Sequence, residues 1–116
     1  MDKLITIMYH YVRDLKHSRY PKIKAMDLKQ FEQQLDFFEE HFNIITMEEV
    51  IHAWNSERRA SLPEKALVLT FDDGYIDNYT NIFPILKKRH LQGSFFIPGK
   101  TINENKILNV NKIHFI

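Results

Sequence analysis

The sequence predicts an α/β fold in which the elements follow the order β-α-β-α-β-α-β. The first observation is that strand-like and helix-like segments alternate along the whole chain. The second is a continuous apolar run over residues 66–71, which is typical of a parallel strand covered on both faces. Alternation of this kind predicts a parallel sheet whose strands are joined by right-handed crossovers.

The composition excludes several classes of protein. The 116 residues carry a net charge of +1, from 16 Lys and Arg against 15 Asp and Glu, which gives no electrostatic case for binding nucleic acid. Cysteine is absent, so disulfide scaffolds, thiolate zinc sites and cysteine nucleophiles are excluded. We find neither a signal peptide nor an apolar run near the roughly 20 residues of a transmembrane segment, so the chain as written is expected to be cytoplasmic.

The N-terminal half predicts two strands and two helices. Residues 4–12 are β-branched and aromatic, which favours a buried strand, and the polar residues 13–24 predict a loop. Asp27 with Gln30 resembles a capping pair before an amphipathic helix. Residues 43–46 predict a short strand, and Thr46 with Glu49 predicts a capping box. The apolar stripe of the first helix consists of Leu28, Phe31, Leu35, Phe38 and Phe42.

The C-terminal half continues the alternation after a polar connector at residues 56–63. The strand at 66–71 is followed by a helix that is expected to begin near Asn81, which puts Pro84 in its first turn, and to end near His90. Gly93 is a normal stop signal, and residues 93–97 predict a fourth strand. The tail at residues 100–116 has no clear pattern. Trp54, on the second helix, is expected either to anchor packing or to stack on a sugar.

Two adjacent acids follow the buried strand directly, in the sequence Asp72-Asp73-Gly74. The carboxyl ends of parallel strands carry active sites in α/β folds. One carboxylate there can bind a divalent cation while the other takes a proton from water, and Gly74 permits a positive φ angle. The alternative is an ordinary turn, because Asp and Gly favour turns for local reasons.

This region resembles the polysaccharide deacetylase domain, also known as the NodB homology domain or carbohydrate esterase family 4. The resemblance is strongest over about residues 65–100 and covers the N-terminal part of that domain. A leading strand like residues 8–12 also occurs in members that act on poly-N-acetylglucosamine. The matching segments are Leu67-Val68-Leu69-Thr70-Phe71-Asp72-Asp73-Gly74, Asn78-Tyr79, Pro84-Ile85-Leu86-Lys87-Lys88 and Gly93-Ser94-Phe95-Phe96-Ile97.

The resemblance implies the first part of a distorted (β/α) barrel and a metal-dependent hydrolase. Its reaction removes N-acetyl or O-acetyl groups from a carbohydrate, acting on a carbon–nitrogen bond that is not a peptide bond. By position, Asp72 matches the catalytic base and Asp73 matches a ligand of the divalent metal, commonly zinc. The two histidine ligands of the family, in a His-x-x-x-His motif, are not found in this chain, and His114 lacks a second histidine at that spacing.

Two further residues are candidates for binding substrate. His10 lies in the first strand, which would run parallel to the Asp72 strand, so it is either at the mouth of the pocket or a hydrogen-bonded core histidine. Tyr9 and Tyr11 point to the opposite face and are expected to pack. Tyr75 follows Gly74 and either lines the substrate groove or faces solvent.

As a domain, residues 1–64 are expected to form an N-terminal βαβα region and residues 65–116 the truncated start of the deacetylase core. A complete eight-stranded barrel needs roughly 250 residues, so we expect an incomplete enzyme. The substrate is expected to be an N-acetylated sugar or polysaccharide, and the family is often exported. The alternatives are an inactive truncated fragment, an interaction domain, and a magnesium-dependent phosphoryl-transfer enzyme, which also uses paired acids at strand ends.

Overall fold

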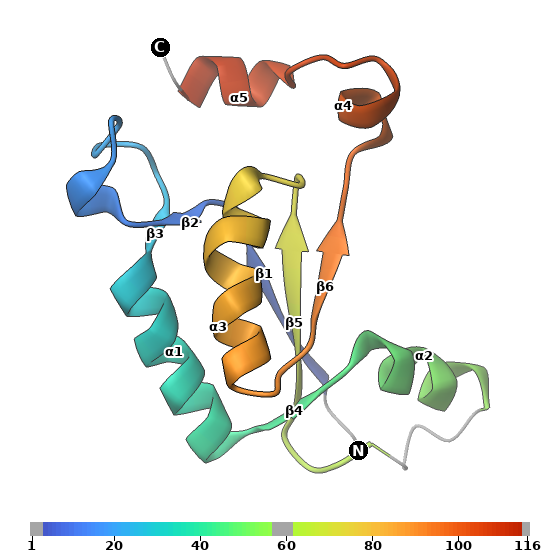
Figure 1. The fold of residues 1–116 in the computed structure, drawn as a ribbon. Coiled ribbons are helices and arrows are strands. Elements are labelled where there is room, and N and C mark those ends of the chain that lie inside the picture. The colour runs from blue at the N-terminus through green and yellow to red at the C-terminus, as the bar shows by residue number, and fades with distance from the viewer. Residues whose placement is uncertain (1–3, 57–61, 115–116) are drawn as a thin grey trace.

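The computed structural model describes residues 4–56 and 62–114 and shows a four-stranded parallel sheet built around β5 (Ala66–Asp72) (Figure 1). Strand β1 (Leu4–Tyr9) pairs along one edge of β5. On the other edge, β4 (Asn43–Ile45) pairs with the first half of β5, and β6 (Gly93–Phe96) pairs with the second half. All of these pairs are parallel, which confirms the predicted α/β fold.

Strand β5 is central because both of its faces are apolar. Leu67, Leu69 and Phe71 are completely buried on one face, and Val68 is buried on the other. The one polar residue between them, Thr70, satisfies its hydroxyl by donating to the carbonyl of Ile7 at 2.9 Å. Helices α1 (Leu28–His41) and α3 (Phe83–Lys88) contribute to the same core. That core consists of Tyr9, Val12, Phe31, Leu35, Leu67, Leu69, Phe71, Ile82 and Leu86.

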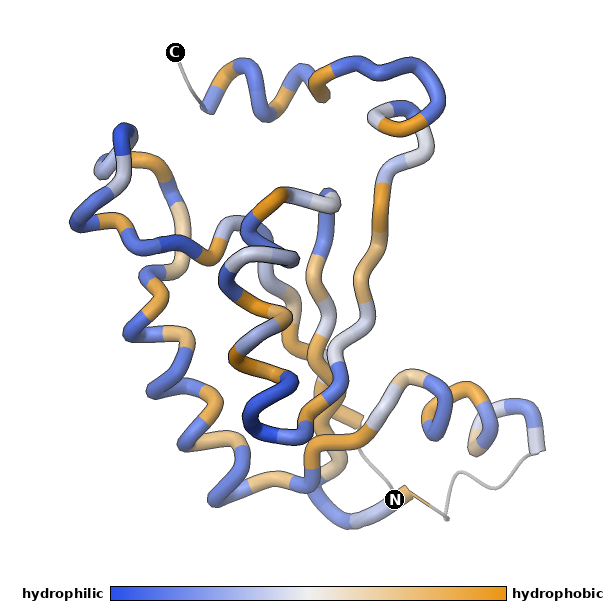
Figure 2. The backbone as a smooth tube through the Cα atoms, in the orientation of Figure 1, coloured by the Kyte–Doolittle hydropathy of each residue, from blue (hydrophilic) through white to orange (hydrophobic). Residues whose placement is uncertain are grey.

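Both predicted helix starts in the N-terminal half are confirmed. Asp27 caps α1, although its carboxylate accepts from the backbone N–H of Lys29 and not from Gln30. Apolar and polar residues alternate along α1, as the amphipathic stripe predicts (Figure 2). Helix α2 (Met47–Asn55) opens with the predicted reciprocal capping box of Thr46 and Glu49. Trp54 is 62% exposed on α2, so it does not lie in the core.

The predicted first strand is divided in two. Strand β1 ends at Tyr9, and the chain then forms β2 (Val12–Arg13), which pairs with β3 (Met26–Asp27) in a small second sheet. The Met26 N–H donates to the Tyr11 carbonyl at 2.9 Å, which draws the chain away from β5. The segment predicted as a loop contains a 3-10 turn, η1 (Leu15–His17).

The regular part of the third helix begins close to the predicted position, but helical structure starts before it. A π-helical turn, η3 (Asn78–Ile82), precedes the regular helix α3, which begins at Phe83. Pro84 lies in the first turn of α3, as predicted, although the π-helical turn runs directly into this helix. The Asn81 side chain donates to the Val12 carbonyl at 2.9 Å and ties this π-helical turn to β2.

The unassigned tail forms two short helices, α4 (Gly99–Asn103) and α5 (Asn109–His114). They lie across the end of the sheet at which β5 and β6 finish (Figure 1). Within the described parts of the chain, every helix is too short or too polar to cross a membrane. Of the predicted connector at residues 56–63, residues 57–61 lie outside the described residues.

Gly93 allows β6 to approach the core, and this closeness gives a testable prediction. A Cβ atom at this position would lie 2.4 Å from Cε2 of the buried Phe71 ring. We expect Gly93→Ala to lower the free energy of unfolding by about 1–3 kcal/mol, because overpacking a well-packed core forces side chains and backbone to shift. Urea unfolding of both variants, with Gly99→Ala as the matched control, provides the test, since the nearest atom at Gly99 is 3.7 Å away. Equal stability of the two variants would contradict this account.

A second prediction concerns the ion pair that joins β2 to the segment after β5. The Arg13 guanidinium donates to both carboxylate oxygens of Asp77, at 2.9 and 3.1 Å, and the Asp77 side chain is only 6% exposed. Breaking a buried pair leaves a charge poorly compensated, so we expect Asp77→Asn to cost about 3 kcal/mol of unfolding free energy. The exposed pair of Lys106 and Glu104 is the control, and Glu104→Gln is expected to change stability by less than about 0.5 kcal/mol. A small effect of Asp77→Asn in the same denaturation experiment would show that this pair does not hold the two segments together.

Candidate functional site

The two carboxylates lie where β5 ends and the chain turns sharply. Asp72 is the last residue of β5 and is paired with Phe96 of β6. Asp73 then adopts a φ of 72° and Gly74 a φ of 63°, so the positive φ predicted at Gly74 is confirmed and extends to the acid before it. The Asp73 N–H donates to the Phe96 carbonyl at 3.0 Å, which fixes the turn to the end of β6. A non-glycine residue held at positive φ is uncommon, and such residues cluster at functional sites.

His10 lies beside both carboxylates. Because β1 and β5 are parallel and in register at Tyr9 and Phe71, the residue after β1 emerges next to the residue after Phe71. The His10 Nε2 atom is 3.9 Å from Asp72 Oδ2 and 3.7 Å from Asp73 Oδ2. The His10 side chain is 47% exposed, so it is not a core histidine and lies instead at the open edge of the sheet. Tyr9 and Tyr11 are buried, as predicted.

Tyr75 reaches back to the site. Its hydroxyl donates to Asp73 Oδ2 at 2.8 Å, and its ring stacks on Tyr11 with 4.0 Å between centroids. Burial, supported by hydrogen bonding to Tyr11 and Asp73, raises the pKa of Tyr75 well above its ordinary value. The phenol therefore stays protonated and remains a donor to the carboxylate.

The C-terminal helix contributes a residue that the sequence did not indicate. The Asn111 amide, on α5, donates to the Tyr75 hydroxyl at 2.6 Å and to the Tyr11 hydroxyl at 2.7 Å. His114 Nδ1 lies 3.3 Å from the same Tyr11 hydroxyl, which places His114 beside the tyrosines. Asn111 is 36 positions from Tyr75 and 100 positions from Tyr11 in the sequence. No local sequence pattern predicts contacts over such separations, and only the fold reveals them.

Two cavities adjoin the turn. One, of 240 Å³, is bordered by Asp73 and Tyr75 at the turn, by Thr101 of α4 and by Asn111 of α5. The other, of 290 Å³, lies beside Gly74 and is mainly apolar. The walls of this second cavity are Gly74, Tyr75, Asn78, Tyr79, Phe83, Phe95 and Ile97.

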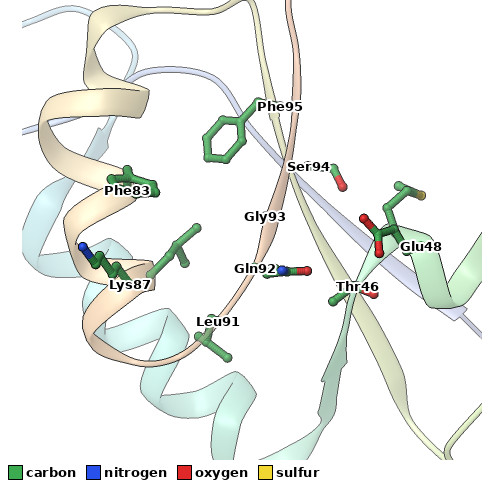
Figure 3. Close-up of a pocket in the computed structure, with 11 residues that line it drawn as sticks. Thr46, Glu48, Phe83, Lys87, Leu91, Gln92, Gly93, Ser94 and Phe95 are labelled. Atoms are coloured by element: carbon green, nitrogen blue, oxygen red, sulfur yellow. The ribbon is translucent and has the colours of Figure 1, made fainter.

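A larger cavity of 420 Å³ lies between α2, α3 and the start of β6 (Figure 3). Lys87 and Glu48 border it from opposite sides, as the close-up shows. Neither carboxylate of the Asp72–Asp73 pair lines it, so its size does not make it the reactive site. It shares Phe83 and Phe95 with the apolar cavity beside Gly74.

The side chains at this edge of the sheet are of the types that bind divalent metals, but they are too few to form a complete metal site. Carboxylate oxygen and imidazole nitrogen are ordinary zinc ligands, and a catalytic zinc usually takes three protein ligands. Among residues 4–56 and 62–114, no three His, Asp or Glu side chains are grouped closely enough to hold a metal ion by themselves. Asp73 is therefore suited to be one ligand of a larger set.

Comparison with known proteins identifies the family. Residues 59–112 match the family model of polysaccharide deacetylases. A Bacillus subtilis polysaccharide deacetylase homologue, YxkH, is 33% identical over 101 residues, covering 86% of this chain and 33% of that protein. The poly-beta-1,6-N-acetyl-D-glucosamine N-deacetylase of Escherichia coli K12 is 34% identical over 84 residues, which cover 72% of this chain and 12% of the enzyme.

Solved structures agree with this assignment. The structure of a de-N-acetylase from Aggregatibacter actinomycetemcomitans matches with a TM-score of 0.74 and 26% identity. It covers 90% of this chain, and the chain covers 42% of that structure. The chain thus spans a third or less of the two curated relatives it matches and somewhat under half of the solved one. It belongs to the polysaccharide deacetylase family and corresponds to part of that family's domain.

Proposed function

We propose that this chain carries the catalytic base and one metal ligand of a carbohydrate deacetylase, which hydrolyses N-acetyl or O-acetyl groups on a sugar. The observation that best supports this is the turn at the end of β5. There the last strand residue, Asp72, and the positive-φ residue, Asp73, both come within 4 Å of one imidazole. Membership of the polysaccharide deacetylase family supports the same chemistry.

In this proposal the two acids divide the work. Asp72 accepts the proton of the attacking water as a general base, since its carboxylate is 28% exposed and has solvent access. Asp73 serves as a ligand of a divalent metal, for which zinc is our choice. When bound, such a metal polarises the acetyl carbonyl and lowers the pKa of water. No group of three His, Asp or Glu side chains that could hold a metal by itself is found among the described residues, so the proposal needs further ligands.

His10 and Tyr75 are proposed to contact the substrate. The His10 imidazole is half-exposed at the open edge of the sheet, so it can donate to a sugar or exchange a proton with the departing amine. The Tyr75 hydroxyl already donates to Asp73, so substrate contact falls to its ring, which lines the apolar cavity beside Gly74. An aromatic wall next to a polar edge is suited to the face of a sugar.

The substrate we propose is an N-acetylated sugar polymer. A relative is named a poly-beta-1,6-N-acetyl-D-glucosamine N-deacetylase, and another similar protein is named a peptidoglycan-N-acetylmuramic acid deacetylase. The division into residues 1–64 and 65–116 stays a prediction, and these two regions share one sheet, because β1 and β4 both pair with β5. A cytoplasmic location likewise stays a prediction.

Substitution of each acid separates the two proposed roles. We expect Asp73→Ala to weaken zinc binding at least about tenfold, because it removes a direct ligand. We expect Asp72→Asn to leave zinc affinity nearly unchanged and to lower acetate release about 100-fold or more, because the amide cannot accept the proton. Calorimetric titration of the chain with zinc, alongside an assay of acetate release from an N-acetylglucosamine oligomer, measures both quantities.

Asp36→Asn is the matched control, since Asp36 is an exposed acid on α1 that pairs with Arg89 far from the turn. It is expected to leave zinc binding and acetate release unchanged. Full acetate release by Asp72→Asn would show that Asp72 is not the base. Unchanged zinc affinity in Asp73→Ala would show that Asp73 is not a ligand.

A further inference from the structure

The Asp73 carboxylate is held by a chain of hydrogen bonds that ends on the C-terminal helix. The Tyr75 hydroxyl donates its single proton to Asp73 Oδ2 at 2.8 Å and accepts from the Asn111 amide at 2.6 Å. The second amide proton of Asn111 goes to the Tyr11 hydroxyl at 2.7 Å. The direction of each bond from Asn111 to Tyr75 to Asp73 is fixed by chemistry, because the ionised carboxylate can only accept.

The two residues that hold Tyr75 in place are more deeply buried than the carboxylate. Tyr11 is 3% exposed and Asn111 is 8% exposed, whereas the Asp73 side chain is 24% exposed. The Tyr11 and Tyr75 rings stack with an angle of 16° between their planes, so Tyr75 has little freedom to swing away. The Tyr75 hydroxyl is held by the Asn111 amide and by the stacked ring, so it offers a fixed donor to the partly exposed carboxylate, and an alternative Asp73 rotamer would lose this hydrogen bond.

Orientation matters here because the backbone at Asp73 is itself unusual. At a φ of 72° the residue lies outside the regular strand, and its side-chain direction is no longer set by the pleat of β5. Tyr75 occupies Oδ2, which leaves Oδ1 as the oxygen without a hydrogen bond from the described residues. The contact therefore selects the carboxylate oxygen that is open to a ligand.

From these contacts we propose that Tyr75 and Asn111 are positioning residues for the Asp73 carboxylate, through which helix α5 sets the affinity of the site for a divalent cation. This inference rests on the proposed role of Asp73 as a metal ligand. Partners that orient a ligand by hydrogen bonding typically change metal affinity about 10–100-fold when they are removed.

The test uses zinc as the probe and substitutions that remove single polar groups. We expect Tyr75→Phe to weaken zinc binding about tenfold while leaving the stacked ring in place. Tyr79→Phe is the matched control, because Tyr79 is 73% exposed and stacks on Phe83. On α5, Asn111→Leu is expected to act like Tyr75→Phe, and Asn109→Ala, at an exposed position of the same helix, is expected to have no effect.

A second readout does not depend on the metal. The carbon-13 resonance of the Asp73 side-chain carboxyl reports its hydrogen bonding, and we expect Tyr75→Phe to shift it while the Asp72 resonance stays in place. A role in packing alone predicts no such shift, since Phe keeps the ring. If Asn111→Leu does not fold, Tyr75→Phe still decides the question, and thermal unfolding of each variant shows which case applies.

The outcomes separate this inference from the proposed function. Loss of zinc affinity together with a shifted Asp73 resonance in Tyr75→Phe supports the inference. If Tyr75→Phe matches Tyr79→Phe in both measurements, the inference is wrong even where Asp73→Ala abolishes zinc binding. If Asp73→Ala leaves zinc affinity unchanged, or if the wild-type chain binds no zinc, the claim that α5 sets zinc affinity is wrong. In that case the carboxyl resonance alone decides whether Tyr75 and Asn111 position Asp73.

Discussion

Burial of β5 on both faces is the constraint on which the other features of this structure depend. Its apolar side chains leave water only when other parts of the chain cover both faces and strands pair along both edges. Complete burial of a side chain such as Leu67, Leu69 or Phe71 stabilises the fold by roughly 1.5–3 kcal/mol. The same burial forbids unpaired polar groups along the strand, and Thr70 obeys this rule by donating to the Ile7 carbonyl. The first carboxylates that β5 can carry therefore appear at its end, where the sheet opens to solvent.

The turn after β5 converts this position into a site. A strand that simply continued would send Asp72 and Asp73 to opposite faces of the sheet. The positive φ of Asp73 breaks that alternation, at a cost of roughly 1–3 kcal/mol for a residue other than glycine. The backbone hydrogen bond to the Phe96 carbonyl and the Tyr75 hydroxyl offset this cost. Strain of this kind persists only where the surrounding structure holds it, and here two neighbouring segments do so.

The sequence alone predicted those features that depend on local pattern. The apolar run of β5, the capping box at Thr46 and the position of Pro84 in the first turn of α3 each follow from neighbours within a few residues. The placement of His10 beside the acids also follows from pattern, because parallel strands end at the same edge. The break of the first strand after Tyr9 does not, since it depends on a hydrogen bond between Met26 and Tyr11, which are distant in sequence.

The contact between α5 and the site lies furthest from local pattern, and it changes how the tail is understood. Residues 100–114 have no marked periodicity, so their ordering cannot come from an amphipathic face of the usual width. Asn111 provides a different reason for order, because its buried amide donates to the Tyr11 and Tyr75 hydroxyls. In the same arrangement, Asn111 supports the tyrosine that holds Asp73. The contacts that order this part of the tail are thus the contacts that orient the carboxylate, so the stability of α5 and the geometry of the site cannot be varied independently.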